Sequence, residues 1–250
     1  MMIKYGILFL MQPYHSDPTF SLIIPAYNEE KYIGDCLTHV IKNASGVFLE
    51  IIVIDNASTD RTTEIAQSFP GVTVVHEARK GLTFARQCGY ESAHGDVLVY
   101  IDADTRVPEK WARILVSEFS KNKDLSCLSG PYVFYDFPKW RQVITRATCA
   151  VGYALFGYFA LGGNFSIRRT VLEKMNGFDT TISFYGEDTN VARRAHEFGK
   201  VLFKSDFFIY TSARRFKGQG FITTSRIYLI NFLSEVFLKR PTTTEYRDIR

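Results

Sequence analysis

The stretch Asp96-Val97-Leu98-Val99-Tyr100-Ile101-Asp102-Ala103-Asp104-Thr105 predicts a buried β-strand that ends in two carboxylates. Its apolar run, residues 97–101, is rich in β-branched and aromatic side chains, as in strands covered on both faces. Asp102 and Asp104 follow two positions apart, so their side chains project to the same side. A hard divalent cation such as Mg²⁺, which bridges carboxylates and substrate phosphates, would offset their repulsion. The alternative is two solvated loop aspartates, because so short a motif also arises by chance.

Strands and helices alternate in the sequence that leads to this stretch. We predict strands at residues 20–24, 51–54 and 72–75. We predict three helices: one begins after Asn28, the second ends at about residue 69, and the third spans residues 81–93. This alternation predicts a parallel sheet with helices on both faces, in which ligands bind beyond the carboxyl ends of the strands. Asn28, Asp55, Asp102 and Asp104 all lie at those ends. Their shared location indicates a site, although each one alone would pass for a turn or capping residue.

The remaining sequence completes one predicted domain. A strand over residues 125–135 is interrupted by a Gly-Pro pair, and an apolar, aromatic segment over 143–161 is broken by glycines. Short strands at 165–167, 201–203 and 207–210, a basic loop at 212–218 and an apolar helix at 221–238 follow. Because no repeat or linker is evident, we divide the chain into an N-terminal extension (1–18), one domain (19–218), and a C-terminal apolar helix and tail (219–250).

Composition sets the class of protein. The chain has 250 residues, of which 46% are hydrophobic, and this supports a full core. Its net charge of +4 is too mild for a nucleic-acid binder with a concentrated basic face. The four cysteines are scattered without metal-site spacing, so we expect reduced thiols and a cytoplasmic protein. The apolar segment at 5–11 lacks a small-residue cleavage site, which argues against a signal peptide.

Four sequence blocks together resemble glycosyltransferase family 2, the inverting sugar-nucleotide transferases with the GT-A fold. They are SLIIPAYNEE at 21–30, IIVIDNASTD at 51–60, GLTFARQCGYESAHGDVLVYIDADT at 81–105, and GGNFSIRRTVLEKMNGFD followed by GEDTNVARRA between 162 and 195. They occur in order over most of the chain, residues 21–210, and leave out the extension and the last helix. The resemblance implies an α/β, single-domain GT-A fold with a mostly parallel, Rossmann-like sheet.

The resemblance also implies roles for individual residues. Those implied for nucleotide binding are Pro25, Ala26, Tyr27, Glu29, Asp55, Lys80, Arg86 and Asp102. Asp104 is implied as the ligand of Mg²⁺ or Mn²⁺, with Asp102 in the ribose or metal shell. Asp188 is implied as the catalytic base, and Glu187 as its assistant or as a group that holds the acceptor.

The implied reaction moves one sugar from a UDP- or GDP-linked donor to an acceptor hydroxyl or phosphate. The acceptor would be a glycan or a lipid-linked molecule, in glycan or glycolipid biosynthesis. The Q-x-x-R-W motif of processive members is absent, which favours a single transfer. Arg214 and Arg215 are candidates for diphosphate contacts, with a solvated surface turn as the alternative. Gly163 and Asn164 are candidates for acceptor contacts, or simply make a turn.

Two other functions remain open. A nucleotidyltransferase uses a similar sheet and metal, but it would need a glycine-rich phosphate loop where this chain has Pro25-Ala26-Tyr27-Asn28. The second is a catalytically inactive module that only binds a sugar nucleotide. Such a module would be free to lose one of its acidic pairs, whereas this chain keeps both Asp102/Asp104 and Glu187/Asp188.

The helix predicted at 221–238 raises the question of a membrane. It is apolar but interrupted by Arg226, Asn231, Ser234 and Glu235, and basic residues flank it on both sides. This pattern predicts peripheral contact with an anionic leaflet on the inner face of the cell membrane. The alternative is a helix packed on the sheet or on a second subunit of a homodimer.

Overall fold

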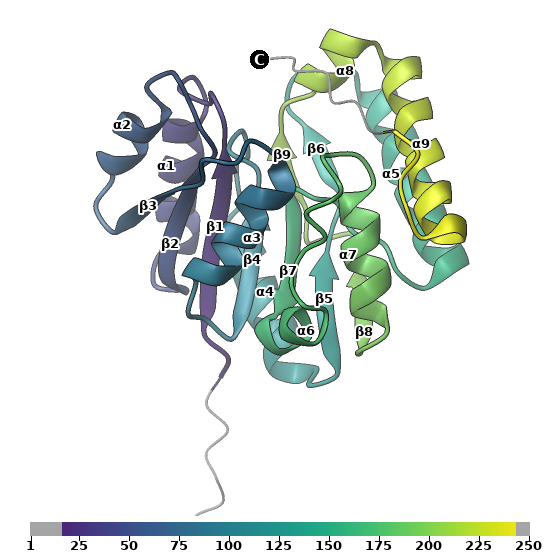
Figure 1. Cartoon of the computed structure of the whole chain (residues 1–250), viewed down its shortest axis with the longest axis horizontal. Coiled ribbons are helices and arrows are strands. Elements are labelled where there is room, and N and C mark those ends of the chain that lie inside the picture. Colours follow the sequence, from purple (N-terminus) through teal and green to yellow (C-terminus); the bar gives the residue numbers. More distant parts are fainter. Residues whose placement is uncertain (1–16, 244–250) are drawn as a thin grey trace, which may run out of the picture.

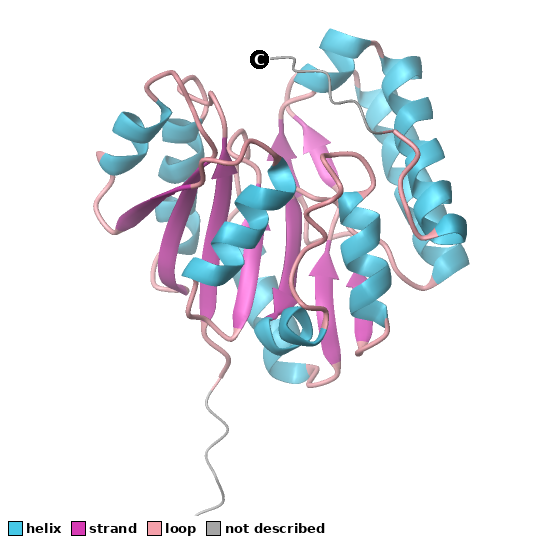
Figure 2. Cartoon of the chain, viewed as in Figure 1, coloured by secondary structure: helices cyan, strands magenta, loops and turns pink. Residues whose placement is uncertain are grey.

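The computed structural model describes residues 17–243, so the predicted N-terminal extension lies almost wholly outside the described residues. The described chain is built on a sheet with strand order β3-β2-β1-β4-β7-β5-β8 (Figures 1 and 2). Its strands are β1 Phe20–Ala26, β2 Phe48–Asp55, β3 Val72–His76, β4 Val97–Ile101, β5 Leu125–Ser129, β7 Asn164–Arg168 and β8 Lys200–Phe203. Strand β7 runs antiparallel to β4 and β5, and the other pairs are parallel. This confirms the predicted mostly parallel sheet.

Helices cover both faces of the sheet, as predicted. One face carries α1 Ile33–Ala44, α2 Thr62–Gln67 and α4 Trp111–Lys121. The other carries α3 Leu82–Ser92, α6 Arg169–Lys174 and α7 Glu187–His196, which lie in front of the sheet in Figure 1. Each layer buries its own apolar cluster against the strands. The two clusters together make one continuous domain core with the sheet at its centre.

Strand β4 lies at the middle of the sheet between β1 and β7. All five of its residues are buried, and Tyr100 stacks on Phe165 of β7 with ring centroids 4.9 Å apart. Burial of a large apolar side chain contributes about 1.5–3 kcal/mol, so this strand is firmly held. The carboxylates that follow it therefore start from a rigid platform.

Three predicted segments differ from the structure. Residues 125–135 form two strands in different sheets, β5 and β6 Tyr132–Phe134, and β6 pairs with β9 Ile209–Thr211. The bend between them falls at Gly130, where a Cβ would lie 2.6 Å from the carbonyl carbon of Phe207. The broken apolar segment is helical up to residue 156, within α5 Lys139–Phe156, and most of the predicted basic loop belongs to the short helix α8 Arg214–Gln219.

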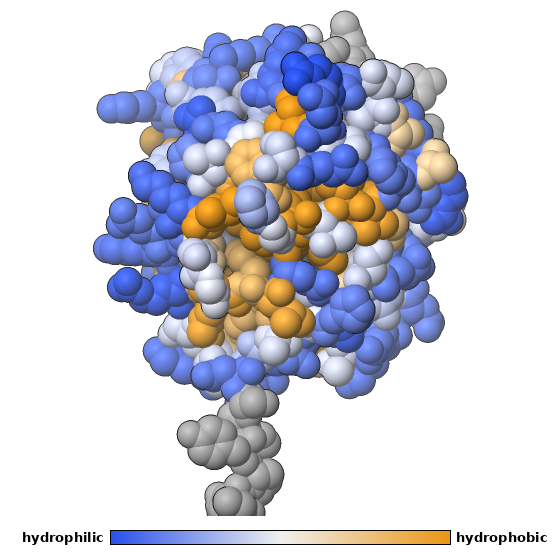
Figure 3. All heavy atoms as spheres, turned by 90° about the vertical axis from the view of Figure 1, so that its left-hand side faces the viewer, coloured by the Kyte–Doolittle hydropathy of each residue, from blue (hydrophilic) through white to orange (hydrophobic). Residues whose placement is uncertain are grey.

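Helix α9 Phe221–Leu238 has the predicted bounds and lies beside α5 at one end of the molecule (Figure 1). The opposite end, formed by α1, α2 and the edge strand β3, is turned towards the viewer in Figure 3. An apolar area lies at the centre of that view and hydrophilic residues surround it. Ile41 of α1 and Leu49 of β2 are exposed apolar side chains of the elements at that end.

Candidate active site

Asp104 lies where β4 gives way to the following loop, beneath the second sheet and α8. Its Oδ1 accepts a hydrogen bond from Thr211 Oγ1 of β9 at 3.1 Å. Its Oδ2 lies 3.0 Å from Nε of Arg214, at the start of α8. The C-terminal part of the domain therefore closes directly over the D-x-D segment.

Arg214 also binds Glu29, in the loop after β1. The two form a bidentate pair, with Nη1 to Oε2 at 2.8 Å and Nη2 to Oε1 at 2.5 Å. Both negative partners raise the pKa of the guanidinium against the effect of burial. One cation thus links the first loop, the D-x-D segment and α8, in a fork geometry that only arginine offers.

The environment of Asp104 fits a divalent cation. Burial raises the pKa of its carboxyl to about 7; Arg214 opposes this rise, while Asp102 and Glu29 add to it. Arg214 alone therefore does not compensate the negative charge around Asp104, and a divalent cation would supply the remaining positive charge. Carboxylate oxygens are ligands that suit Mg²⁺ or Mn²⁺. Within residues 17–243 no group of three or more His, Cys, Asp or Glu side chains is arranged to hold a metal. Phosphate oxygens of a ligand would have to complete such a site.

The loop Gly162-Gly163 joins the D-x-D segment to the second acidic pair. A Cβ on Gly163 would collide with the Asp102 carboxylate and lie 2.9 Å from Tyr132 Oη. A Cβ on Gly162 would lie 2.8 Å from Oε1 of Glu187. The Gly163 N–H donates to Tyr132 Oη at 2.7 Å, which fixes the loop. The two acidic pairs therefore lie on either side of a loop that has no side chains.

Glu187 begins α7 and is paired inside the protein. Its Oε1 lies 2.8 Å from Nη1 of Arg86, a fully buried residue of α3 whose Nη2 donates to the Gly162 carbonyl at 2.8 Å. Burial raises the pKa of Glu187 to about 8; Arg86 opposes the rise and Asp188 adds to it. The predicted nucleotide ligand Arg86 thus lies behind the second acidic pair, where it holds both Glu187 and the glycine loop.

Asp188 is the more accessible member of this pair. Burial raises the pKa of its carboxyl, and hydrogen bonds from the Thr189 and Gly162 N–H groups oppose the rise. The Thr189 N–H donates to Oδ1 at 2.7 Å. Its place in the first turn of α7 also favours negative charge through the helix dipole. A carboxylate with a raised pKa beside a bare loop is suited to accept a proton.

The ends of β1 and β2 form the third part of the site. Ala26 lies opposite Asp55 in the sheet register. Asp55 accepts a hydrogen bond from the Ser58 N–H at 3.1 Å and lies 3.0 Å from His76 Nδ1. Lys80 donates to the hydroxyl of Tyr27 at 2.6 Å. These side chains line the same edge of the sheet as Asp102 and Asp104.

Comparison with known proteins identifies the family. The family model described as glycosyl transferase family 2 matches residues 21–185. The chain belongs to glycosyltransferase family 2. The match runs from β1 to the residue before Gly186, so Glu187 and Asp188 lie just beyond it.

Relatives and solved structures agree with this assignment. A dolichol-phosphate mannosyltransferase of Pyrococcus furiosus is 29% identical over 61% of this chain and 47% of its own length. A probable glycosyltransferase of Bacillus subtilis, YdaM, is 30% identical over 73% of this chain and 47% of its own. The chain therefore spans about half the length of these relatives.

Two solved structures share the GT-A fold of this family 2 chain. The mannosyltransferase PcManGT of Pyrobaculum calidifontis, in complex with GDP-Man and Mn²⁺, has a TM-score of 0.63 at 21% identity and covers 84% of this chain and 63% of its own. Glucosyl-3-phosphoglycerate synthase of Mycobacterium tuberculosis, in complex with Mn²⁺, UDP and phosphoglyceric acid, has a TM-score of 0.65 at 20% identity. The match covers 88% of this chain and 79% of the synthase chain. The predicted fold class is thereby confirmed.

One predicted contact lies inside the core of the domain. Asn164 is fully buried, and its side chain accepts from Trp111 Nε1 and donates to the carbonyls of Gly130 and Phe207. Both N–H groups of its amide donate inside the core, and its amide oxygen accepts there as well, so the buried side chain does not reach an acceptor. The side chain of Asn164 thus holds the glycine loop on β7, and an acceptor contact at this position stays a prediction for the backbone alone.

Several residues of the site had no signal in the sequence. Tyr132 and Thr211 come from the small second sheet, and each contacts a loop or carboxylate far away in the chain. Asn28, which by sequence alone could also cap α1, adopts a left-handed conformation, and its side chain accepts a hydrogen bond from the Thr59 N–H. Arg215, the other predicted diphosphate contact, lies over the ring of Phe184 at 4.3 Å.

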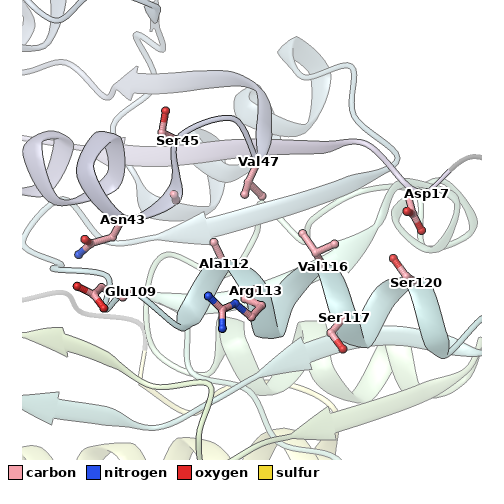
Figure 4. Close-up of a pocket in the computed structure, with 11 residues that line it drawn as sticks. Asp17, Asn43, Ser45, Val47, Glu109, Ala112, Arg113, Val116, Ser117 and Ser120 are labelled. Atoms are coloured by element: carbon pink, nitrogen blue, oxygen red, sulfur yellow. The ribbon is translucent and has the colours of Figure 1, made fainter.

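A groove of about 550 Å³ lies elsewhere, between the C-terminal end of α1 and α4 (Figure 4). Its walls include Asn43, Glu109 and Arg113. None of the predicted site residues lines it. It is therefore separate from the candidate active site.

Proposed function

We propose that this chain transfers one sugar from a UDP- or GDP-linked donor to an acceptor hydroxyl or phosphate, with inversion and with a divalent metal. The observation that carries this proposal is the placement of two acidic pairs on either side of the Gly162-Gly163 loop. One pair suits the diphosphate of a donor, and the other suits the acceptor. A role in glycan or glycolipid biosynthesis follows from the acceptors that such enzymes use.

The nucleotide would bind at the ends of β1 and β2. Asp55 can accept from a base N–H or a ribose hydroxyl, and the ring of Tyr27 offers a surface for the base. Similar folds support a nucleotide-sugar donor: one is in complex with GDP-Man, and TarS of S. aureus is in complex with UDP-GlcNAc. The choice of base and sugar depends on pocket contacts that differ by single hydroxyls.

Asp104, with Asp102, would hold Mg²⁺ or Mn²⁺ together with the donor phosphates. The metal would supply positive charge to the departing diphosphate. Arg214 already neutralises part of Asp104 and, from the start of α8, also pairs with Glu29 in the first loop. It is therefore suited to add charge to the same leaving group.

Asp188 would act as the base in a single displacement. Its carboxylate takes the proton of the acceptor hydroxyl as the acceptor oxygen bonds to the anomeric carbon. The bond from that carbon to the diphosphate breaks on the opposite side, which inverts the configuration and releases the nucleoside diphosphate. Glu187, held by Arg86, fixes the start of α7 and thereby the position of Asp188.

A thermal-shift panel tests the donor and the metal together. The chain is heated with UDP, GDP, UDP-sugars or GDP-mannose, each with Mn²⁺ or with chelator. We expect the correct nucleotide to raise the melting temperature only with metal, because a ligand of the native state stabilises it by mass action. Full turnover in excess chelator would exclude the metal role.

Donor turnover separates the enzyme from its alternatives. An active transferase should slowly hydrolyse the donor without acceptor, whereas an inactive binding module would show a melting shift and no hydrolysis. A nucleotidyltransferase would instead release pyrophosphate from a nucleoside triphosphate. Proton coupling at the anomeric position of the product then shows inversion, and a retained configuration would overturn the mechanism.

A further inference from the structure

Helix α9 has its polar side buried and its apolar side exposed. Its buried residues are Thr224, Asn231, Ser234 and Glu235. Its exposed large apolar residues are Ile222, Tyr228, Leu229, Ile230, Leu233, Phe237 and Leu238. A helix of a soluble domain normally buries its apolar stripe and exposes its polar one. The alternative in which α9 packs its apolar side on the sheet is therefore wrong for this structure.

Specific polar contacts fix this orientation. Glu235 is fully buried, and its Oε1 accepts from Asn190 Nδ2 at 2.9 Å and from Arg193 Nη2 at 2.9 Å, both on α7. Asn231 accepts from the backbone N–H groups of Thr242 and Thr243. Rotation of α9 to bury its apolar side would break this ion pair and cost the buried Glu235 carboxylate its partners on α7, while Arg193 would keep only Glu197, 3.6 Å away. The apolar side is therefore held outward.

Helix α5 adds to the same exposed surface. Among its residues 59% of Trp140 and 70% of Leu155 are exposed, and Val143, Ile144 and Val151 are exposed as well. The two helices lie side by side, and Phe156 of α5 contacts Phe232 and Phe237 of α9 with ring centroids 5.5 and 6.1 Å apart (Figure 1). So much exposed apolar surface in one place marks an interaction site.

The charges of the two helices indicate what covers them. Helix α5 has no acidic residue, and the only one of α9, Glu235, is buried. The basic residues on and directly after these helices are Lys139, Arg141, Arg146, Arg226, Lys239 and Arg240. Basic residues beside large apolar ones complement an anionic lipid surface, where the charges meet headgroups and the apolar side chains enter the boundary of the acyl chains.

We propose that the outward sides of α5 and α9 form a docking surface for an anionic bilayer, on which the protein lies without crossing it. Helix α9 is long and apolar enough to span a membrane by length and composition. Its bound polar side, however, keeps it attached to α7. A cytoplasmic protein would meet such lipids on the inner face of the cell membrane.

The surface is joined to the candidate active site by α8. Arg214 at the start of α8 contacts Asp104, and α9 begins directly after α8. If the proposed function holds, an acceptor on a lipid would be presented beside the site. The docking surface itself does not depend on that function, so the binding experiment below stands apart from any activity assay.

Flotation of the whole 250-residue chain with lipid vesicles tests the proposal. Vesicles of neutral phosphatidylcholine are compared with vesicles that contain about 30% phosphatidylglycerol, at low salt and at 0.5 M NaCl. We expect the protein to float with the anionic vesicles at low salt. The fraction of protein that floats with the neutral vesicles should be at least tenfold smaller. High salt should weaken the binding because it screens the charges.

Matched variants locate the surface. Leu155→Glu and Phe237→Glu change side chains that are each 70% exposed, so the fold should tolerate them, and each should lower vesicle binding about tenfold. Leu49→Glu is the control, since its position is 60% exposed and belongs to the opposite end of the molecule, seen in Figure 3. It should bind vesicles like the unaltered chain.

Tryptophan fluorescence gives a second measurement. Of the two tryptophans, Trp111 is buried and Trp140 is exposed on α5. Anionic vesicles should therefore shift the emission to the blue, and Trp140→Phe should remove the shift. The proposal fails if the folded chain stays soluble beside anionic vesicles at low salt, or if Leu49→Glu lowers binding as much as the helix variants. A homodimer interface is the competing explanation. The proposal also fails if light scattering shows a homodimer that the helix variants dissociate, and if neither the unaltered chain nor the variants bind vesicles.

Discussion

Replacement of Gly163 by alanine tests the geometry of the candidate active site with a single methyl group. The added Cβ would overlap the Asp102 carboxylate and approach Tyr132 Oη to 2.9 Å, whereas ordinary contact begins near 3.4 Å. The backbone at Gly163 does not have the positive φ that strains a side chain, so the clash is local. We expect the Asp102 carboxylate to move by about 1 Å, a misplacement that costs roughly 10²-fold in rate.

This loss corresponds to about 2.7 kcal/mol of transition-state stabilisation. The folded state should survive, since such overpacking costs about 1–3 kcal/mol out of the 5–15 kcal/mol typical of a domain. The assay is kcat/KM with the donor found in the thermal-shift panel, together with Mn²⁺ affinity by electron paramagnetic resonance. Both should fall, while the melting temperature falls by only about 2–12 °C, as this cost predicts, and the chain stays folded at the assay temperature.

Gly34→Ala is the matched control for this experiment. Its Cβ would meet Ile65 Cγ2 at 3.4 Å, an ordinary contact, and the helix gains up to about 1 kcal/mol from the alanine. It should leave kcat/KM unchanged. A folded Gly163→Ala variant with undiminished kcat/KM and Mn²⁺ affinity would refute the proposed role of Asp102.

The buried charges lead to three further predictions. Asp188→Asn should lower turnover by about 10²–10⁴-fold with donor affinity nearly unchanged in calorimetry, and undiminished turnover would exclude it as the base. Burial raises the pKa of Glu187 from 4.5 to about 8, so the native state binds the proton of this carboxyl more tightly than the unfolded state does. The contribution of Glu187 to the free energy of unfolding should therefore fall as the pH rises from about 4.5 to 8. Urea unfolding at several pH values should show this slope, and Glu187→Gln should reduce it. Glu235→Gln removes the buried negative partner of Arg193 and should cost about 3 kcal/mol in the same assay, whereas exposed Thr223→Ala on the same helix should cost less than about 0.5 kcal/mol.

The sequence by itself was sufficient for features that depend on neighbouring residues. The apolar run of β4 and the alternation of strands and helices predicted a mostly parallel sheet, because burial on both faces leaves a continuous apolar pattern. Parallel strands end at one edge, so the order of the strands along the chain was enough to place Asp55, Asp102 and Asp104 together. The bounds of α9 were also predicted, since no glycine or proline interrupts residues 221–238.

Only the tertiary structure decided which distant groups meet. Arg214 pairs with Glu29 across 185 residues of chain, and no local pattern relates the two. The structure likewise placed Arg86 behind Glu187 and Gly163 against Asp102. Helix α9 is the sharpest case: its sequence shows a polar and an apolar side, but the direction in which they face depends on Arg193 of α7. A buried charge needs an opposite charge in reach, and only the folded chain supplies it.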